Sequence, residues 1–400
     1  MIIGLIGKAN VGKSTFFNAA TDLAVPVANY PFTTIEPNVG VAYARTKCVC
    51  REFGVQDNPV HSVCIDGNRF IPIKLVDIAG LVPGAHAGKG LGNKFLDDAR
   101  QADALIHIID ASGSTDNNGR PVRAGTGDPA FDIQFVEEEF DLWLESIIGR
   151  DWGKTAREAE SQGQKLEQLL AKRLSGLAIS EQTITNAVQA SGLASKKPVA
   201  WTQNDILLFC KVLRTKAKPF VIAANKADLP SAEDNIKKIK AGGLELIPCA
   251  SEAEALLRKA SKKGILHYLP GDASFDVKPE VTLNAQQQKA LDIVKGFMQK
   301  YGSTGVQEVI NIACFKFLRM VEVYPVEDEF KLTDKKGNVL PDVWLLPEGS
   351  TAKDLAGAIH ADLAKGFLYA IDVRTKQRIS ASYQLKSGDV IKIASATSRG

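Results

Sequence analysis

Residues 7–14, with the sequence Gly-Lys-Ala-Asn-Val-Gly-Lys-Ser, constrain this chain more than any other segment because they match the pattern G-x-x-x-x-G-K-S. An apolar run at residues 2–6 predicts a strand before them, and residues 14–21 predict a helix after them. In such a unit the glycines let main-chain N–H groups close around phosphate oxygens, and the helix N-terminus adds its positive end. The segment therefore predicts a phosphate-binding loop in an α/β fold.

The phosphate-binding loop is expected to contact the nucleotide along its whole length. Lys13 should reach the β- and γ-phosphates, and the Ser14 hydroxyl should bind Mg²⁺. The other nucleotide-binding residues predicted here are Gly7, Lys8, Ala9, Asn10, Val11, Gly12 and Thr15.

Asp77-Ile78-Ala79-Gly80 closes an apolar strand predicted at residues 71–77. In a parallel sheet the carboxyl ends of the strands meet at one edge, where ligands bind. Asp77 is therefore expected to hold magnesium through water, and the Gly80 amide to face the γ-phosphate. The pattern D-x-x-G is a weak signal alone, and it gains its weight from its place after the phosphate-binding loop.

Asn225-Lys226-Ala227-Asp228 follows a second apolar strand, predicted at residues 219–224. Asp228 can accept hydrogen bonds from the N1–H and the exocyclic amine of guanine, a donor pair that adenine lacks, so this residue can carry most of the base selection. Lys226 is expected along the base plane, and Asn225 is expected to brace the phosphate-binding loop. Ala250-Ser251 should place a backbone N–H near guanine O6. GTP and GDP are the predicted ligands.

The segment between the phosphate-binding loop and Asp77 contains two adjacent threonines, Thr33 and Thr34. A threonine here can bind magnesium only while the γ-phosphate is present, and this dependence makes such a loop a switch. We predict that Thr34, rather than Thr33, is this ligand, so the predicted metal ligands are Ser14, Thr34 and Asp77.

The length of 400 residues predicts more than one domain. Short apolar strands separated by helical patterns predict a mostly parallel sheet with helices on both faces, the fold of a P-loop NTPase. This G domain is assigned to residues 1–134 and 216–280, and a helical insertion to residues 135–215. Connecting helices are expected at 281–320, and a small α+β domain at 321–400.

The bulk composition predicts an ordinary globular protein of the cytoplasm. The formal charge is +3, with 45% hydrophobic residues and no apolar run long enough to cross a membrane. A monomer is the expected state. Four residues of types that bind metals lie close in sequence: Cys48, Cys50, His61 and Cys64. They allow a zinc site, a loop with incidental thiols, or one disulfide, and the Cys-x-Cys spacing disfavours the zinc site relative to the other two.

Two stretches give the chain a resemblance to a known family: NYPFTTIEPN at residues 29–38 and DIAGLVPGAHAGKGLGNKFL at residues 77–96. With the motifs above, they look like the Obg superfamily of GTPases, specifically an archaeal-type form of its YchF/Obg-like subfamily. Residues 321–396 are similar to a TGS domain, which has a ubiquitin-like fold. Its matching stretches are residues 346–352, 358–362 and 387–390. The resemblance implies a GTP hydrolase with a helical insertion and a C-terminal TGS domain.

Two departures from the family pattern concern the base site. Better-known YchF-type members have an altered base motif and prefer ATP, whereas residues 225–228 are intact here and predict GTP. G domains usually show Ser-Ala where this chain has Ala250-Ser251.

The position after D-x-x-G, where many small GTPases use a glutamine to orient the attacking water, is Leu81. The resemblance therefore implies a hydrophobic-substituted GTPase with slow basal turnover. In related GTPases an asparagine at the position of Asn10 helps to hold potassium near the phosphates, where the ion does the electrostatic work of an arginine finger. The alternative is an amide that stabilises the loop. The predicted catalytic residues are Lys13, Thr34, Gly80 and Asn10.

Local basic clusters, such as Arg374/Lys376/Arg378, can grip phosphate backbones or can be solvated faces of the fold. The resemblance associates TGS domains with RNA and ribosomes, so the ribosome or RNA is the expected partner, through the TGS-like domain and the helical insertion. Two alternatives remain: an RNA-binding module whose nucleotide is structural, and an ATPase.

Overall fold

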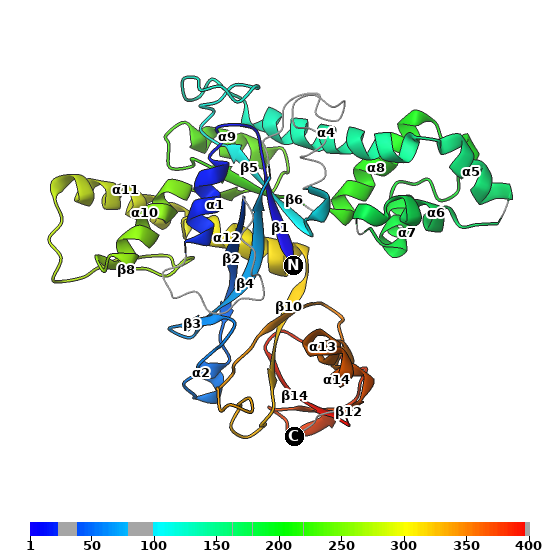
Figure 1. Ribbon diagram of the computed structural model, residues 1–400. Helices are drawn as coiled ribbons and strands as arrows, with labels where there is room; N and C mark the ends of the chain where they lie inside the picture. Colours follow the sequence, from blue (N-terminus) through cyan, green and yellow to red (C-terminus); the bar gives the residue numbers. More distant parts are fainter. Residues whose placement is uncertain (23–37, 79–98, 162, 178, 219, 397–400) are drawn as a thin grey trace. The chain divides into compact units, whose positions relative to one another are not determined.

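Figure 1 shows the computed structural model of the chain, in which two compact units are distinguished. The described residues are 1–22, 38–78, 99–161, 163–177, 179–218 and 220–396. Of these described residues, 1–22, 38–40 and those within 74–309 belong to the first unit, and 41–73 and 310–396 belong to the second. Strands β2 (Val39–Lys47) and β4 (Asn68–Asp77) each begin in one unit and end in the other. The domain boundaries given by the sequence remain predictions.

The first unit is built on parallel strands. In order across the sheet they are β4, β1 (Ile2–Ile6), β5 (Ala104–Asp110), β6 (Phe220–Asn225) and β7 (Ile247–Pro248). Each neighbouring pair is parallel, and all residues of β5 are buried. Parallel strands covered on both faces have this continuous apolar character. The predicted α/β class, with a mostly parallel sheet, is confirmed.

The chain forms helices between and after these strands, where the sequence has apolar residues at helical spacing. They are α1 (Lys13–Thr21), α9 (Ala232–Ala241), α10 (Ser251–Lys262) and α11 (Ala285–Tyr301). Buried residues of α9, α10 and α11 form one core cluster with Ile109 of β5 and Ile222 of β6. A short antiparallel pair, β8 (Leu266–His267) with β9 (Asp276–Val277), lies between α10 and α11 in the chain. The carboxyl ends of the strands are thereby fixed against a packed core.

The middle of the first unit is helical, as predicted. Its helices are α4 (Pro129–Gly149), α5 (Trp152–Ser161), α6 (Leu166–Arg173), α7 (Glu181–Ala190) and α8 (Gln203–Ala217). Helices α4 and α8 run alongside each other (Figure 1), with Phe140 and Phe209 in a shared core cluster. Local signals set the helix starts, because Asp128 caps α4 and a Thr202–Asp205 capping box begins α8.

The second unit contains a five-stranded mixed sheet that matches the predicted α+β domain. The strand order is β11 (Trp344–Pro347), β10 (Met320–Val326), β14 (Asp389–Ser395), β12 (Phe367–Asp372) and β13 (Gln377–Ile379). Helices α13 (Ala352–Ile359) and α14 (Ala361–Lys365) accompany it. The same unit includes α2 (Cys50–Phe53) and β3 (Val63–Ile65). Helix α12 (Val306–Asn311) precedes it, followed by a π-helical turn at Ile312–Phe317.

Among the described helices, none combines the length and the apolar character needed to cross a bilayer.

Candidate nucleotide-binding site

The loop between β1 and α1 packs so closely on the neighbouring strands that two of its positions require glycine. A Cβ atom on Gly7 would lie 2.4 Å from the carbonyl oxygen of Ile108. Gly12 has a φ of 93°, and a Cβ atom there would lie 2.2 Å from Nδ2 of Asn225. The two glycines of the motif therefore let the main chain of the loop approach the ends of β5 and β6.

Two of the three residues predicted to hold magnesium, Ser14 and Asp77, lie together at the carboxyl end of β4. The Ser14 hydroxyl donates a hydrogen bond to Oδ2 of Asp77 at 3.2 Å, and Nζ of Lys13 lies 3.8 Å from Oδ1. Oδ1 of Asp77 is buried and has no hydrogen-bond partner among the residues that the structure describes. A buried carboxylate oxygen normally has a donor or a cation, and Mg²⁺ prefers oxygen ligands with waters retained. The donor set therefore fits a magnesium ion.

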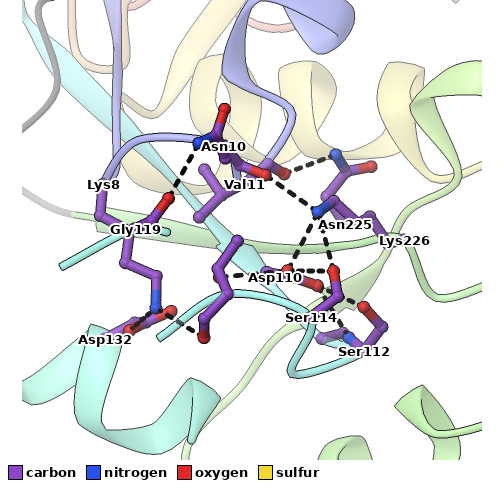
Figure 2. Close-up of polar contacts among 12 residues, drawn as sticks. Lys8, Asn10, Val11, Asp110, Ser112, Ser114, Gly119, Asp132, Asn225 and Lys226 are labelled. Carbon is purple, nitrogen blue, oxygen red and sulfur yellow. Dashed lines mark hydrogen bonds and ion pairs between the residues drawn. The ribbon is translucent and has the colours of Figure 1, made fainter. Parts of the chain in front are cut away.

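Asn225 and Lys226 join the end of β6 to the phosphate-binding loop (Figure 2). Nδ2 of Asn225 donates to the carbonyl oxygen of Val11 at 2.9 Å, while its Oδ1 accepts from the backbone N–H and hydroxyl of Ser251 at 3.1 and 2.8 Å. Nζ of Lys226 donates to the carbonyl oxygen of Asn10 at 2.9 Å. The asparagine braces the loop as expected, and it also ties the start of α10 to the same point.

Asp110, the last residue of β5, is a buried anion beneath Lys226 that sequence reasoning missed. Its carboxylate accepts hydrogen bonds from Ser112, Ser114 and Lys226 at distances of 2.6 to 3.1 Å. Burial opposes its ionisation, but these hydrogen bonds outweigh that effect and lower the pKa of Asp110. The signal available in the sequence was a carboxylate that ends an apolar strand and is followed by Ser112 and Ser114.

The side chains of Lys8 and Asn10 are held by the segment that follows β5. Nζ of Lys8 lies 2.6 Å from Oδ1 of Asp132 on α4 and donates to the carbonyl oxygen of Asp116 at 2.7 Å. Nδ2 of Asn10 donates to the carbonyl oxygen of Gly119 at 2.9 Å (Figure 2). The Lys8 side chain is therefore engaged within the protein, and contact of Lys8 with the nucleotide remains a prediction that concerns its main chain only. For Asn10 the geometry favours the loop-stabilising alternative, and its potassium role remains a prediction.

The Lys8–Asp132 ion pair is buried on both sides, with side chains 3% and 4% exposed. Burial raises the pKa of Asp132 to about 6 although Lys8 lowers it, so the carboxyl group is still mostly ionised at neutral pH. Because removal of one partner leaves an uncompensated buried charge, we expect Asp132→Asn to lower the free energy of unfolding by about 3 kcal/mol. Urea denaturation followed by tryptophan fluorescence would measure this loss.

The matched control for this ion pair is Glu233→Gln, which removes a carboxylate that pairs with Lys237 and Lys300 on the surface. Water replaces such contacts readily, so a much smaller change is expected. Equal losses in the two variants would contradict the structural importance of the buried pair.

Asp228 lies just after β6 and is exposed, which leaves its carboxylate accessible to a ligand. It borders two small cavities together with Ile293 and Phe297 of α11. Although the residue as a whole is exposed, contact with these surroundings partly desolvates its carboxyl group and raises its pKa. At the neighbouring position, the N–H of Ala250 donates to the carbonyl oxygen of Thr304 at 3.0 Å. The amides of Ala250 and Ser251 therefore both have protein partners, and their contact with guanine O6 remains a prediction.

Three predicted positions of the catalytic region, Thr34, Gly80 and Leu81, lie outside the described residues.

Three family profiles match this chain. One described as a 50S ribosome-binding GTPase matches residues 2–126, one described as the G4 motif-containing domain of Obg-like GTPase YGR210-like matches residues 223–328, and the TGS domain matches residues 331–395. An uncharacterised GTP-binding protein of Methanocaldococcus jannaschii is 49% identical over 397 residues, 99% of each chain. The chain belongs to the Obg-like GTPase family. The resemblance given by its motifs is thus confirmed.

Other relatives of this Obg-like GTPase differ in the nucleotide that their names state. An uncharacterised GTP-binding protein of Schizosaccharomyces pombe is 36% identical and covers 88% of each chain. The ribosome-binding ATPase YchF of Mycoplasma genitalium is 30% identical, over 91% of this chain and 86% of its own. The crystal structure of a GTP binding protein from Pyrococcus horikoshii superimposes with a TM-score of 0.77, at 40% identity, over 99% of this chain and 100% of the other.

Proposed function

We propose that this Obg-like GTPase hydrolyses GTP to GDP and phosphate and uses the reaction as a switch. The observation that carries the proposal is the position of Asp228: an accessible carboxylate three residues beyond Asn225, whose amide joins the phosphate-binding loop to α10. A nucleotide whose base is bound by Asp228 would have its phosphates at Lys13 and Ser14. The intact base motif favours guanine, because adenine offers no donor pair to a carboxylate.

In this proposal the residues of the chain bind and orient the triphosphate while water attacks the γ-phosphorus and the bond to the β–γ bridging oxygen breaks. Lys13 stabilises the negative charge that develops on the phosphate oxygens, and the amides of the phosphate-binding loop hold those oxygens in place. Ser14, Asp77 and Thr34 would hold Mg²⁺, which supplies further charge neutralisation when bound. Leu81 cannot orient the water, so the chain alone should turn over slowly.

The proposed partner is the ribosome or RNA, and support comes from the second unit as well as from the relatives. A family described as a ribosome-binding GTPase and a relative named a ribosome-binding ATPase both match this chain. Arg378 of the matched TGS region lies over the ring of Tyr369 at 4.3 Å, and Lys376 lies over the ring of Phe330, the residue just before that region, at 4.9 Å. Phe330 is 78% exposed. An exposed aromatic ring beside a cation is the kind of surface on which proteins stack the bases of single-stranded nucleic acid.

The proposal is tested by calorimetric titration of the purified chain with GTP, GDP and ATP. GTP is expected to bind roughly a hundredfold more tightly than ATP, because ATP leaves the Asp228 carboxylate without its two donors. Hydrolysis should be lost when magnesium is chelated. A preference for ATP would instead assign the chain to the ATPases among its relatives.

Two further arms of the same experiment address stimulation. Hydrolysis is measured with and without ribosomes, and in potassium and in sodium buffers. Stimulation by ribosomes that falls at higher salt would support the proposed partner. Equal rates in the two buffers would remove the potassium role of Asn10.

A further inference from the structure

Three cysteine thiols and one carboxylate converge at one point of the second unit. The Sγ atoms of Cys48, Cys50 and Cys64 and a carboxylate oxygen of Asp57 all lie within 4.8 Å of one another. Cys48 and Cys50 are buried, at 4% and 5% exposure. Asp57 takes the place that the sequence grouping gives to His61. The His61 ring instead faces Asp342, with its Nδ1 atom 2.5 Å from Oδ1 of that residue.

The spacing of these atoms agrees with tetrahedral coordination of zinc. Sγ of Cys50 lies 3.8 Å from Sγ of Cys64, and Sγ of Cys48 lies 3.2 Å from Oδ2 of Asp57. Zn–S bonds of about 2.3 Å at tetrahedral angles place two sulfur atoms about 3.8 Å apart. All six cysteines of the chain are free, including these three. The cluster therefore provides four ligand atoms, three sulfur and one carboxylate oxygen, of types that bind zinc in proteins.

Arg69 supplies a buried positive charge beside this anionic cluster. Its side chain is 0% exposed, its Nε donates to Sγ of Cys48 at 3.4 Å, and its Nη2 donates to Oδ2 of Asp57 at 2.9 Å. In the β3–β4 hairpin Arg69 pairs directly with Cys64, so the two side chains share one face of the sheet. A cation that bonds to the ligands from outside both orients them and offsets their excess negative charge.

We infer that Cys48, Cys50, Cys64 and Asp57 form a structural site for one zinc ion. Each cysteine that binds as a thiolate releases its proton to solvent, so the site closes with no change of oxidation state. The ion would tie α2, the loop that contains Asp57 and the β3 strand into one body. These elements contribute to the same core cluster as Tyr324 of β10. The expected role is therefore to stabilise this part of the second unit.

The test uses the full-length chain purified from cells grown with zinc, and measures bound metal by mass spectrometry. One zinc ion per chain is expected. Replacement by Co²⁺ should then give the charge-transfer absorption of cobalt–thiolate bonds. A wild-type chain that contains no zinc and gives no such absorption with Co²⁺ would overturn the inference. So would a metal-free chain with a disulfide between Cys50 and Cys64.

Substitutions of single residues test whether the zinc ion is bound at this cluster. Cys64→Ser should lose the zinc, whereas Cys314→Ser, which changes another buried cysteine of the second unit, should retain it. Asp57→Asn should lower the affinity for Zn²⁺ by roughly tenfold or more in competition with a chelator. Zinc retained in full by Cys64→Ser would contradict the assignment. If that variant does not fold, the zinc content and the cobalt spectrum of the wild-type chain decide the question.

Discussion

Lys13→Ala is expected to lower the rate of GTP hydrolysis by roughly a hundred- to a thousandfold, the size seen when one preorganised electrostatic contact with a transition state is removed. The Nζ atom of Lys13 lies 3.8 Å from Oδ1 of Asp77, at the point where the phosphate-binding loop meets the end of β4. A cation held there stabilises the charge that moves onto the β–γ bridging oxygen as the bond breaks. Measurement of released phosphate under single-turnover conditions would report the effect on the chemical step.

The control for this variant is Lys295→Ala, which removes an exposed lysine on α11 of the same unit. Its rate should equal that of the unchanged chain. A Lys13→Ala chain that hydrolyses GTP at the normal rate would show that the motif does not perform the chemistry. A chain that loses hydrolysis but keeps all its cellular activity would favour the alternative of an RNA-binding module with a structural nucleotide.

The parts of the site that could be predicted from the sequence are those whose residues lie next to each other in the chain. Gly7 and Gly12 are needed because the main chain of the phosphate-binding loop approaches β5 and β6 closely. Both glycines are part of the G-x-x-x-x-G-K-S pattern, so the sequence shows them directly. Asn225 and Asp228 likewise follow a strand whose apolar run is visible. The parallel sheet, the helical middle region and the C-terminal α+β domain were predictable for the same reason, since periodicity and turn signals are local.

The parts that could not be predicted depend on contacts between residues far apart in the chain. Lys8 is 124 positions from Asp132, and Lys226 is 116 positions from Asp110. No local pattern indicates that either cation will meet its carboxylate, so the sequence predicts nucleotide contact for Lys8 and gives no sign of its ion pair. The cysteine cluster shows the same limit, because the fold brings Asp57 to the three thiols and directs His61 to Asp342.

Asp228→Asn is expected to reverse the base preference of the chain. A carboxylate accepts from both the N1–H and the exocyclic amine of guanine, whereas the amide of asparagine turns an N–H₂ donor toward that amine. Two charge-assisted hydrogen bonds contribute about 3 to 6 kcal/mol, so the affinity for GTP should fall by roughly a hundred- to ten-thousandfold. Xanthine carries a carbonyl oxygen where guanine carries the amine, and this oxygen can accept from the new amide.

Xanthosine triphosphate should therefore bind the Asp228→Asn chain more tightly than GTP does, and the order should be the opposite for the unchanged chain. Calorimetric titration with both nucleotides measures the reversal. Asp234→Asn, which alters an exposed carboxylate on α9, should leave both affinities unchanged. The reversal distinguishes base reading from simple damage, because a chain with a distorted loop would lose both nucleotides together. A variant that still prefers GTP would mean that the base is read by another part of the chain.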